Sequence, residues 1–178
     1  IKLNAQIPSS IDSVTYVNNP RAAAQNWAES EGYEDTHKFL TGLGLNHKFN
    51  DHSAIDASIF YTSRNSYEWR PFNILEDKNN AVGSRIKYNY VNNWNKYLFD
   101  LMIGGEYYID FYDWQTYEND NKEQGGMISD NKEQRQNINL FFKADLTFSF
   151  KTFLTFGLNL NHTYYDYQSL FALDGSDN

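Results

Sequence analysis

Polar and apolar residues alternate along this chain in long runs that restart after each turn. Between residues 37 and 49, one parity contains Phe39, Leu43, Leu45 and Phe49, and the other contains Gly42, Gly44, Asn46 and Lys48. Successive side chains of a β-strand point to opposite faces, so each run predicts a strand with one apolar and one polar face. The runs cover about 12 to 19 residues, well beyond the usual strand of ~5–6 residues.

The alternation predicts an all-β, antiparallel up-and-down meander of about six long strands. The predicted strands cover residues 37–49, 54–68, 81–92, 97–115, 135–149 and 152–168. Short turns at 50–53, 93–96 and 150–151 alternate with predicted long loops at 6–36, 69–80, 116–134 and from 169 onward. Residues 21–31 could form a short helix within the first loop. Short turns that alternate with long loops are typical of a transmembrane β-barrel of the bacterial outer membrane.

Composition narrows the function classes. The 178 residues carry a net charge of −8, 17% aromatic residues and no Cys, and their number predicts one domain. The acidic balance disfavours a nucleic-acid partner, which needs clustered Lys and Arg. No run approaches the ~18 apolar residues of a membrane helix, and the first residues do not read as a signal peptide. The mean hydropathy of −0.71 favours a water-soluble protein, but membrane β-strands are half polar and such an average hides them.

Aromatic residues gather near both ends of the predicted strands. Amphipathic rings suit the headgroup level of a membrane, so these residues predict two interface girdles. The expected girdle at the short turns contains Phe49, Trp94, Tyr97, Phe148 and Phe150, and the expected girdle at the long loops contains Tyr67, Trp69, Phe111, Trp114 and Tyr164. The simpler reading is that β-strands favour aromatic residues in any fold.

Motifs for catalysis or metal binding are weak. The four His residues, at positions 37, 47, 52 and 162, lack metal-ligand spacing, so we expect no metal site. No nucleophile elbow, phosphate loop or dinucleotide fingerprint is present, and no catalytic residue or cofactor is predicted. Residues 174–178 only faintly match a calcium loop. The sequence DNKEQ occurs at 120–124 and at 130–134, where a solvated hairpin loop is a better reading than a cation site.

Four stretches follow one another in an order and spacing that resemble a known family. They are YVNNPRAAAQNW (16–27) with EGYED (31–35), RPFNILEDKNNAVGSR (70–85), GGEYYIDFYDWQTYEN (104–119) and GLNLNHTYY (157–165). Together they resemble the middle of the barrel in TonB-dependent outer-membrane receptors of the siderophore and iron-complex type. The resemblance implies a 22-stranded barrel, of which residues 1–178 would be a partial domain in the outer membrane of a Gram-negative bacterium.

The same resemblance implies transport rather than enzymatic chemistry. Such a receptor captures a ferric siderophore or another scarce ligand and is powered through the TonB complex. Its partners would be that ligand, outer-membrane lipid and its own N-terminal plug domain. We expect the plug and the TonB-contact segment to lie outside this stretch. Six strands in an open sheet would leave two unpaired edges, so we also expect a fragment of a larger chain that does not fold stably alone in water.

Two sets of candidate binding residues follow from the resemblance. Charged residues of the polar parity would face the lumen and the plug, although a porin or a soluble sheet would also solvate such a face. They are Asp56, Arg64, Glu68, Arg85, Lys87, Glu106, Asp110, Lys143 and Asp145. In the outer loops, aromatic area and a bidentate guanidinium suit ligand capture. The candidates there are Trp27, Tyr33, Trp69, Arg70 and Phe72, each of which could instead pack its own loop.

Two alternative functions stay open at this stage. One is a passive, porin-like outer-membrane barrel. The other is a soluble antiparallel β-sandwich that acts as a binding module, such as a carbohydrate-binding domain. A sandwich needs strands of ~5–6 residues and frequent turns, which this chain lacks. An enzyme is the least favoured reading because no motif supports it.

Overall fold

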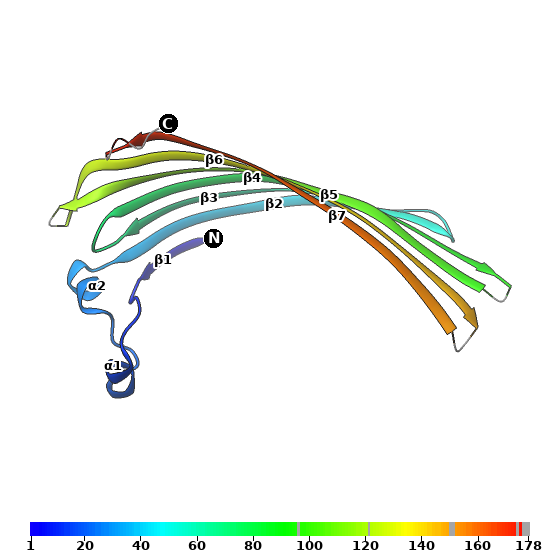
Figure 1. The fold of residues 1–178 in the computed structure, drawn as a ribbon, viewed down its shortest axis with the longest axis horizontal. Helices are drawn as coiled ribbons and strands as arrows, with labels where there is room; N and C mark the ends of the chain where they lie inside the picture. The colour runs from blue at the N-terminus through cyan, green and yellow to red at the C-terminus, as the bar shows by residue number, and fades with distance from the viewer. Residues whose placement is uncertain (96, 121, 150–151, 174, 176–178) are drawn as a thin grey trace.

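The computed structural model describes residues 1–95, 97–120, 122–149, 152–173 and 175. Within them, seven strands form one antiparallel sheet in chain order, and Figure 1 shows a single curved sheet with long strands side by side. The predicted all-β meander is therefore confirmed. The strands are β1 (Lys2–Gln6), β2 (Tyr33–Asn50), β3 (Ser53–Trp69), β4 (Ile74–Trp94), β5 (Tyr97–Asp120), β6 (Glu123–Ser149) and β7 (Thr152–Ala172).

Two predicted long loops are wrong. The segments 69–80 and 116–134 are mostly strand, because β3 and β4 are separated only by residues 70–73, and β5 ends at Asp120 just before β6 begins at Glu123. Most side chains on both faces are polar in these segments, so no parity marks them in the sequence. The backbone ladder nevertheless continues, as in the register of Lys78 opposite Asp113. Short and long connections therefore do not alternate along the chain as predicted. Instead, β3 with β4 and β5 with β6 form long hairpins.

The segment between β1 and β2 carries two short helices at one end of the sheet (Figure 1). They are α1 (Ser13–Asn18) and α2 (Gln25–Ser30), and α2 agrees with the helix expected within 21–31. Asp12 caps α1 by accepting a hydrogen bond of 2.7 Å from the Thr15 amide, and this bond holds the pKa of the Asp12 carboxyl below its usual value. Neither described helix has the length and apolar character needed to cross a membrane.

The sheet has two bare faces rather than a covered core. Among the described residues, the buried hydrophobic side chains are Ile74 and Ala81. Cross-strand partners share a face, and one face carries rows of exposed apolar side chains. One such row contains Leu45, Ala57, Ile86, Gly105, Leu140 and Leu160. Leu43 is 78% exposed and Leu160 is 63% exposed. An apolar surface of this extent indicates contact with a membrane or a partner.

These rows form an apolar band at the short-turn end of the sheet. We define the apolar band as the side chains that share the face of Leu45 within 41–49, 55–61, 82–90, 99–109, 136–146 and 154–164. The β5 part of the band spans about as many residues as the ~9–11 that cross a bilayer in a tilted strand. Beyond it, the same face turns polar, with Lys78, Asp113 and Lys132 in neighbouring register positions.

The structure corrects one predicted girdle. Trp114 shares the polar face with Asp77 and Asn131 and cannot belong to a lipid-facing girdle, because its even position opposes that of Phe111. At the short-turn end, Trp94 stacks on Phe99 at 5.9 Å between ring centroids. The remaining girdle assignments stay predictions. Phe150 lies outside the described residues, as do the 150–151 turn, Lys96, Asn121 and most of the weak calcium-loop match (174 and 176–178).

Candidate ligand-binding site

The polar face carries a series of cross-strand ion pairs. All the charged residues predicted on the polar parity lie on this one face, because strand alternation and register bring them there. Four pairs join neighbouring strands: Arg64 with Asp77 at 2.8 Å, Lys87 with Asp56 at 3.2 Å, Arg135 with Asp110 at 2.9 Å, and Arg85 with Glu106. A fifth pair, Lys143 with Asp145 at 2.6 Å, lies within β6. Each basic side chain in this series therefore already has a carboxylate partner.

Amide and hydroxyl groups extend these ion pairs into a network. The Asn139 amide donates to Glu106 at 3.3 Å, and the Thr155 hydroxyl donates to Asp145 at 2.7 Å. The Asn79 amide donates to Asp110 in the same way. Half-exposed ion pairs contribute little stability individually, so the network mainly provides an ordered, hydrogen-bonding wall. The lumen position of this wall stays a prediction.

Arg64 and Asp77 form a pair whose carboxylate is buried. The Asp77 side chain is 6% exposed, and burial raises the pKa of its carboxyl, helped by the carboxylates of Glu34 and Glu68 and opposed by Arg64. Burial alone would lower the pKa of the Arg64 guanidinium, but the hydrogen bond and charge of Asp77 outweigh it and the net shift is upward. Removal of Arg64 would leave the Asp77 carboxylate buried without a counter-ion, and this would lower the stability of the folded state.

The five residues expected to capture ligand lie together around the turn between β3 and β4. The Trp27 ring from α2 packs edge-on against the Phe72 ring, with 6.1 Å between the ring centroids. Tyr33 stacks on Trp69 with 6.4 Å between the centroids and an angle of 5° between the ring planes. The Arg70 guanidinium pairs with Glu68. Segments distant in sequence thus meet at one cluster, in which Phe72 is the most exposed member. Their role in ligand capture stays a prediction.

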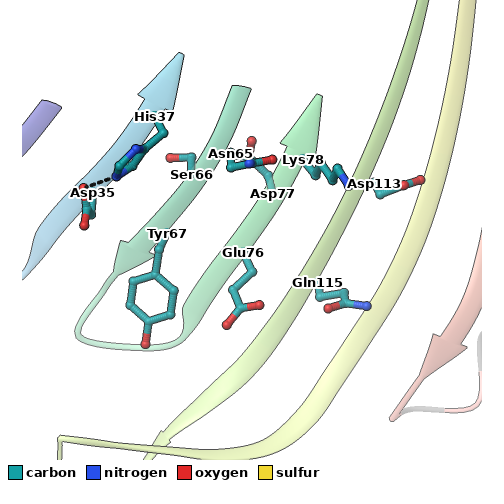
Figure 2. Close-up of a pocket in the computed structure, with 10 residues that line it drawn as sticks. All are labelled: Asp35, His37, Asn65, Ser66, Tyr67, Glu76, Asp77, Lys78, Asp113 and Gln115. Carbon is teal, nitrogen blue, oxygen red and sulfur yellow. Dashed lines mark ion pairs between the residues drawn. The ribbon is translucent and has the colours of Figure 1, made fainter. Parts of the chain in front are cut away.

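A cavity of about 620 Å³ lies beyond the apolar band. Figure 2 shows the residues that line it, drawn from β2, β3, β4 and β5. Most of these residues share the face that carries the apolar band, including Asp35, Tyr67 and Glu76. This cavity therefore lies on the opposite face from the ion-paired wall, between the apolar band and the end of the sheet that carries the β3–β4 turn.

Within the described part of the chain, no group of three or more His, Cys, Asp or Glu is arranged to hold a metal ion. The repeated DNKEQ sequence lies in the β5–β6 hairpin rather than in a free loop, since its second copy, 130–134, is part of β6.

The sequence did not predict a second cavity of about 430 Å³. It lies where the last part of β5, the first part of β6 and the last part of β7 meet, and its lining includes Trp114, Asn131 and Tyr167. Asn131 fell within a predicted loop, where no parity indicated its direction. Shifts in register between Asp130 and Asn131 and between Thr116 and Tyr117 shape this region. Bulges of this kind redirect side chains and leave no clear signal in a single sequence.

One antiparallel sheet of long strands with an apolar and a polar face is the structure of a barrel wall. Comparison with solved structures then identifies similar walls. The chain is similar to the ferric citrate transporter FecA in its unliganded form, with a TM-score of 0.75 and 12% identity over 94% of this chain and 26% of that one. It is also similar to the ferric-catecholate import receptor Fiu from E. coli K12, with a TM-score of 0.63 and 11% identity over 78% of this chain and 27% of that one.

These similarities show the fold. The chain spans about a quarter of the length of each of these two proteins, which are transport proteins rather than enzymes by their descriptions. No family model matches the chain, and no curated protein matches it. The predicted fold class is thus confirmed, whereas the number of strands in a complete barrel stays a prediction.

Proposed function

We propose that this chain is part of the barrel of a TonB-dependent outer-membrane receptor that imports a ferric siderophore or a similar iron complex in a Gram-negative bacterium. The observation that carries the proposal is the segregation of the two faces. One face presents an exposed apolar band, and the other presents paired charges such as Arg135 with Asp110. The likeness of the fold to FecA along nearly the whole chain supports it further.

The two faces suit different neighbours in such a receptor. The apolar band would contact lipid, since a barrel strand alternates apolar residues outward with polar residues inward. The ion-paired wall would face the lumen and its plug domain, supplied by another part of the full-length protein. The cluster around Tyr33, Trp69 and Phe72, at the end with the helices, would lie outside the cell and meet ligand first.

Iron uptake by the full-length protein tests this proposal. Cells that depend on it for iron should accumulate radioactive iron from a ferric siderophore, and uptake should stop when an uncoupler collapses the proton gradient that powers TonB. A passive porin-like barrel would continue to admit small solutes after uncoupling. A soluble binding module would be recovered without detergent and would not run as a heat-modifiable band on a gel. Either of these results would contradict the proposal.

A further inference from the structure

The 430 Å³ cavity on the ion-paired face has an uncharged lining. We call it the upper pocket, and the residues that matter for its chemistry are Trp114, Asn131, Tyr167, Ser169 and Leu173. Trp114, Asn131 and Ser169 are register partners across β5, β6 and β7, in the same row as Asp77. Among the described residues that line the pocket, none has a charged side chain. Its volume suits a small molecule or a portion of one.

Asn131 carries an unused hydrogen-bond donor in the pocket wall. The residue is 2% exposed, its Oδ1 accepts a hydrogen bond from the Tyr167 hydroxyl, and its Nδ2 has no partner in the described structure. A buried donor without a partner costs free energy that a suitable acceptor would recover. Tyr167 is 47% exposed, so its ring can turn toward solvent and let a ligand oxygen approach the Asn131 amide.

The basic side chains of this face offer little to an anion, and the charged residue opposite Tyr167 is the acidic Glu133. Arg64 is held by Asp77 and Arg135 by Asp110, so an anionic ligand would have to displace a carboxylate to gain a guanidinium. Breaking such pairs leaves a partly buried carboxylate uncompensated, which is costly. The upper pocket and its surroundings therefore favour a ligand that brings oxygen acceptors without net negative charge.

We propose that the upper pocket binds the uncharged, oxygen-rich part of an iron complex of the trihydroxamate type. This inference rests on the proposed function and names its ligand class. Each hydroxamate carries one negative charge, so three of them neutralise ferric iron, whereas three catecholates leave an excess of negative charge. The Asn131 Nδ2 would donate to a hydroxamate or amide carbonyl, the Ser169 hydroxyl would add a polar contact, and Trp114 with Leu173 would contact the alkyl chain.

Binding measurements on the full-length protein in detergent test the inference. The probes are ferrioxamine B as the trihydroxamate, a ferric tricatecholate and ferric citrate. The test variant is Asn131→Leu, which keeps the branched shape and the number of side-chain heavy atoms and removes the amide donor and acceptor. The matched control is Asn137→Leu, because Asn137 lies on the same face of β6, about 20 Å from Asn131 at ~3.3 Å per residue. We expect Asn131→Leu to weaken ferrioxamine B binding about fivefold to tenfold and Asn137→Leu to leave it unchanged.

The outcomes separate this inference from the proposed function. If ferrioxamine B binds and both variants behave alike, the upper pocket is not its site and the inference is overturned. If only the anionic complexes bind, the inference is overturned while the proposed function stands. If none of the iron complexes binds to folded, heat-modifiable protein, both fail. A thermal unfolding midpoint of Asn131→Leu equal to or above that of the parent shows that weaker binding does not come from misfolding.

Discussion

At the scale of single residues, the polar wall depends on close approach between neighbouring strands. A Cβ added at Gly104 would lie 2.5 Å from the Ile86 carbonyl oxygen and 2.5 Å from the Phe141 ring. A Cβ added at Gly44 would meet its nearest atom only at 4.0 Å, the carbonyl oxygen of Ala57. The first contact involves backbone, so the β4–β5 ladder would have to shift, whereas the second is ordinary van der Waals contact.

We therefore expect Gly104→Ala to destabilise the full-length barrel by about 1–3 kcal/mol, the usual cost of overpacking. Gly44→Ala, its matched control, should be neutral or slightly stabilising because Ala restricts the unfolded chain more than Gly does. Urea unfolding in lipid vesicles, followed by the heat-modifiable band, measures both. Equal stabilities for the two variants would show that the strands approach less closely at Gly104 than the structure indicates.

The Arg64–Asp77 pair gives a second residue-scale prediction. Because the pKa of Asp77 is raised in the folded state, its carboxyl is more stable protonated there than in the unfolded chain. This difference in proton affinity stabilises the folded state fully below the ordinary Asp pKa of ~3.9, and the stabilisation is lost as the pH rises through the pKa of Asp77 in the folded state. Removing Arg64 takes away the charge that opposes this shift.

Arg64→Leu should therefore cost about 2 kcal/mol near pH 7, less than for a fully buried pair because Arg64 is 41% exposed. The stability difference between variant and parent should shrink as the pH falls toward 4, since protonated Asp77 needs no cation. Urea unfolding at several pH values measures this difference. A difference that stays constant or grows on acidification would contradict the assignment of Arg64 as the group that favours the ionised form of Asp77.

At the scale of elements, alternation predicted the strands wherever one face is apolar and failed where both faces are polar. β7 shows the success, since Leu154, Phe156 and Leu158 lie on one face of a strand that their alternation predicts. The top of β4 shows the failure, since Glu76 and Lys78 lie on one face and Asp77 on the other. Paired backbone groups rather than side-chain polarity hold this part of the sheet together, and single-sequence patterns do not report such pairing.

The two faces of β7 give an element-scale prediction. Leu158 is 62% exposed in the middle of the apolar band, and the next residue, Asn159, lies on the ion-paired face. Leu158→Arg should destabilise the full-length protein in a bilayer by about 2–4 kcal/mol, the cost of Arg near the membrane midplane. Asn159→Arg should have little effect, since its side chain would enter a wet, polar lumen. Vesicle unfolding experiments compare the two, and equal costs would contradict the assignment of the faces.

At the scale of the whole molecule, the sequence predicted one sheet with two unlike faces but not its full height or its clefts. The candidate residues Tyr33 and Trp69 meet because β2 and β3 extend beyond the predicted boundaries. The upper pocket depends on register shifts that only the three-dimensional structure reveals. A sheet with Leu43 and Leu160 exposed also needs a membrane or a partner on its apolar face.

Lipid accessibility in the full-length protein tests the central claim most directly. Residues 1–178 contain no Cys, and any cysteine elsewhere in the full-length protein is first replaced by Ser. Single cysteines at Leu43 and Leu158 on one face, and at Asn46 and Asn159 on the other, can then each carry a fluorophore. In outer-membrane vesicles, we predict that nitroxide-labelled lipid quenches the probes at positions 43 and 158 and that a water-soluble quencher reaches those at 46 and 159. Water-soluble quenching at all four positions, without quenching from lipid, would contradict the account of this chain as an outer-membrane barrel wall.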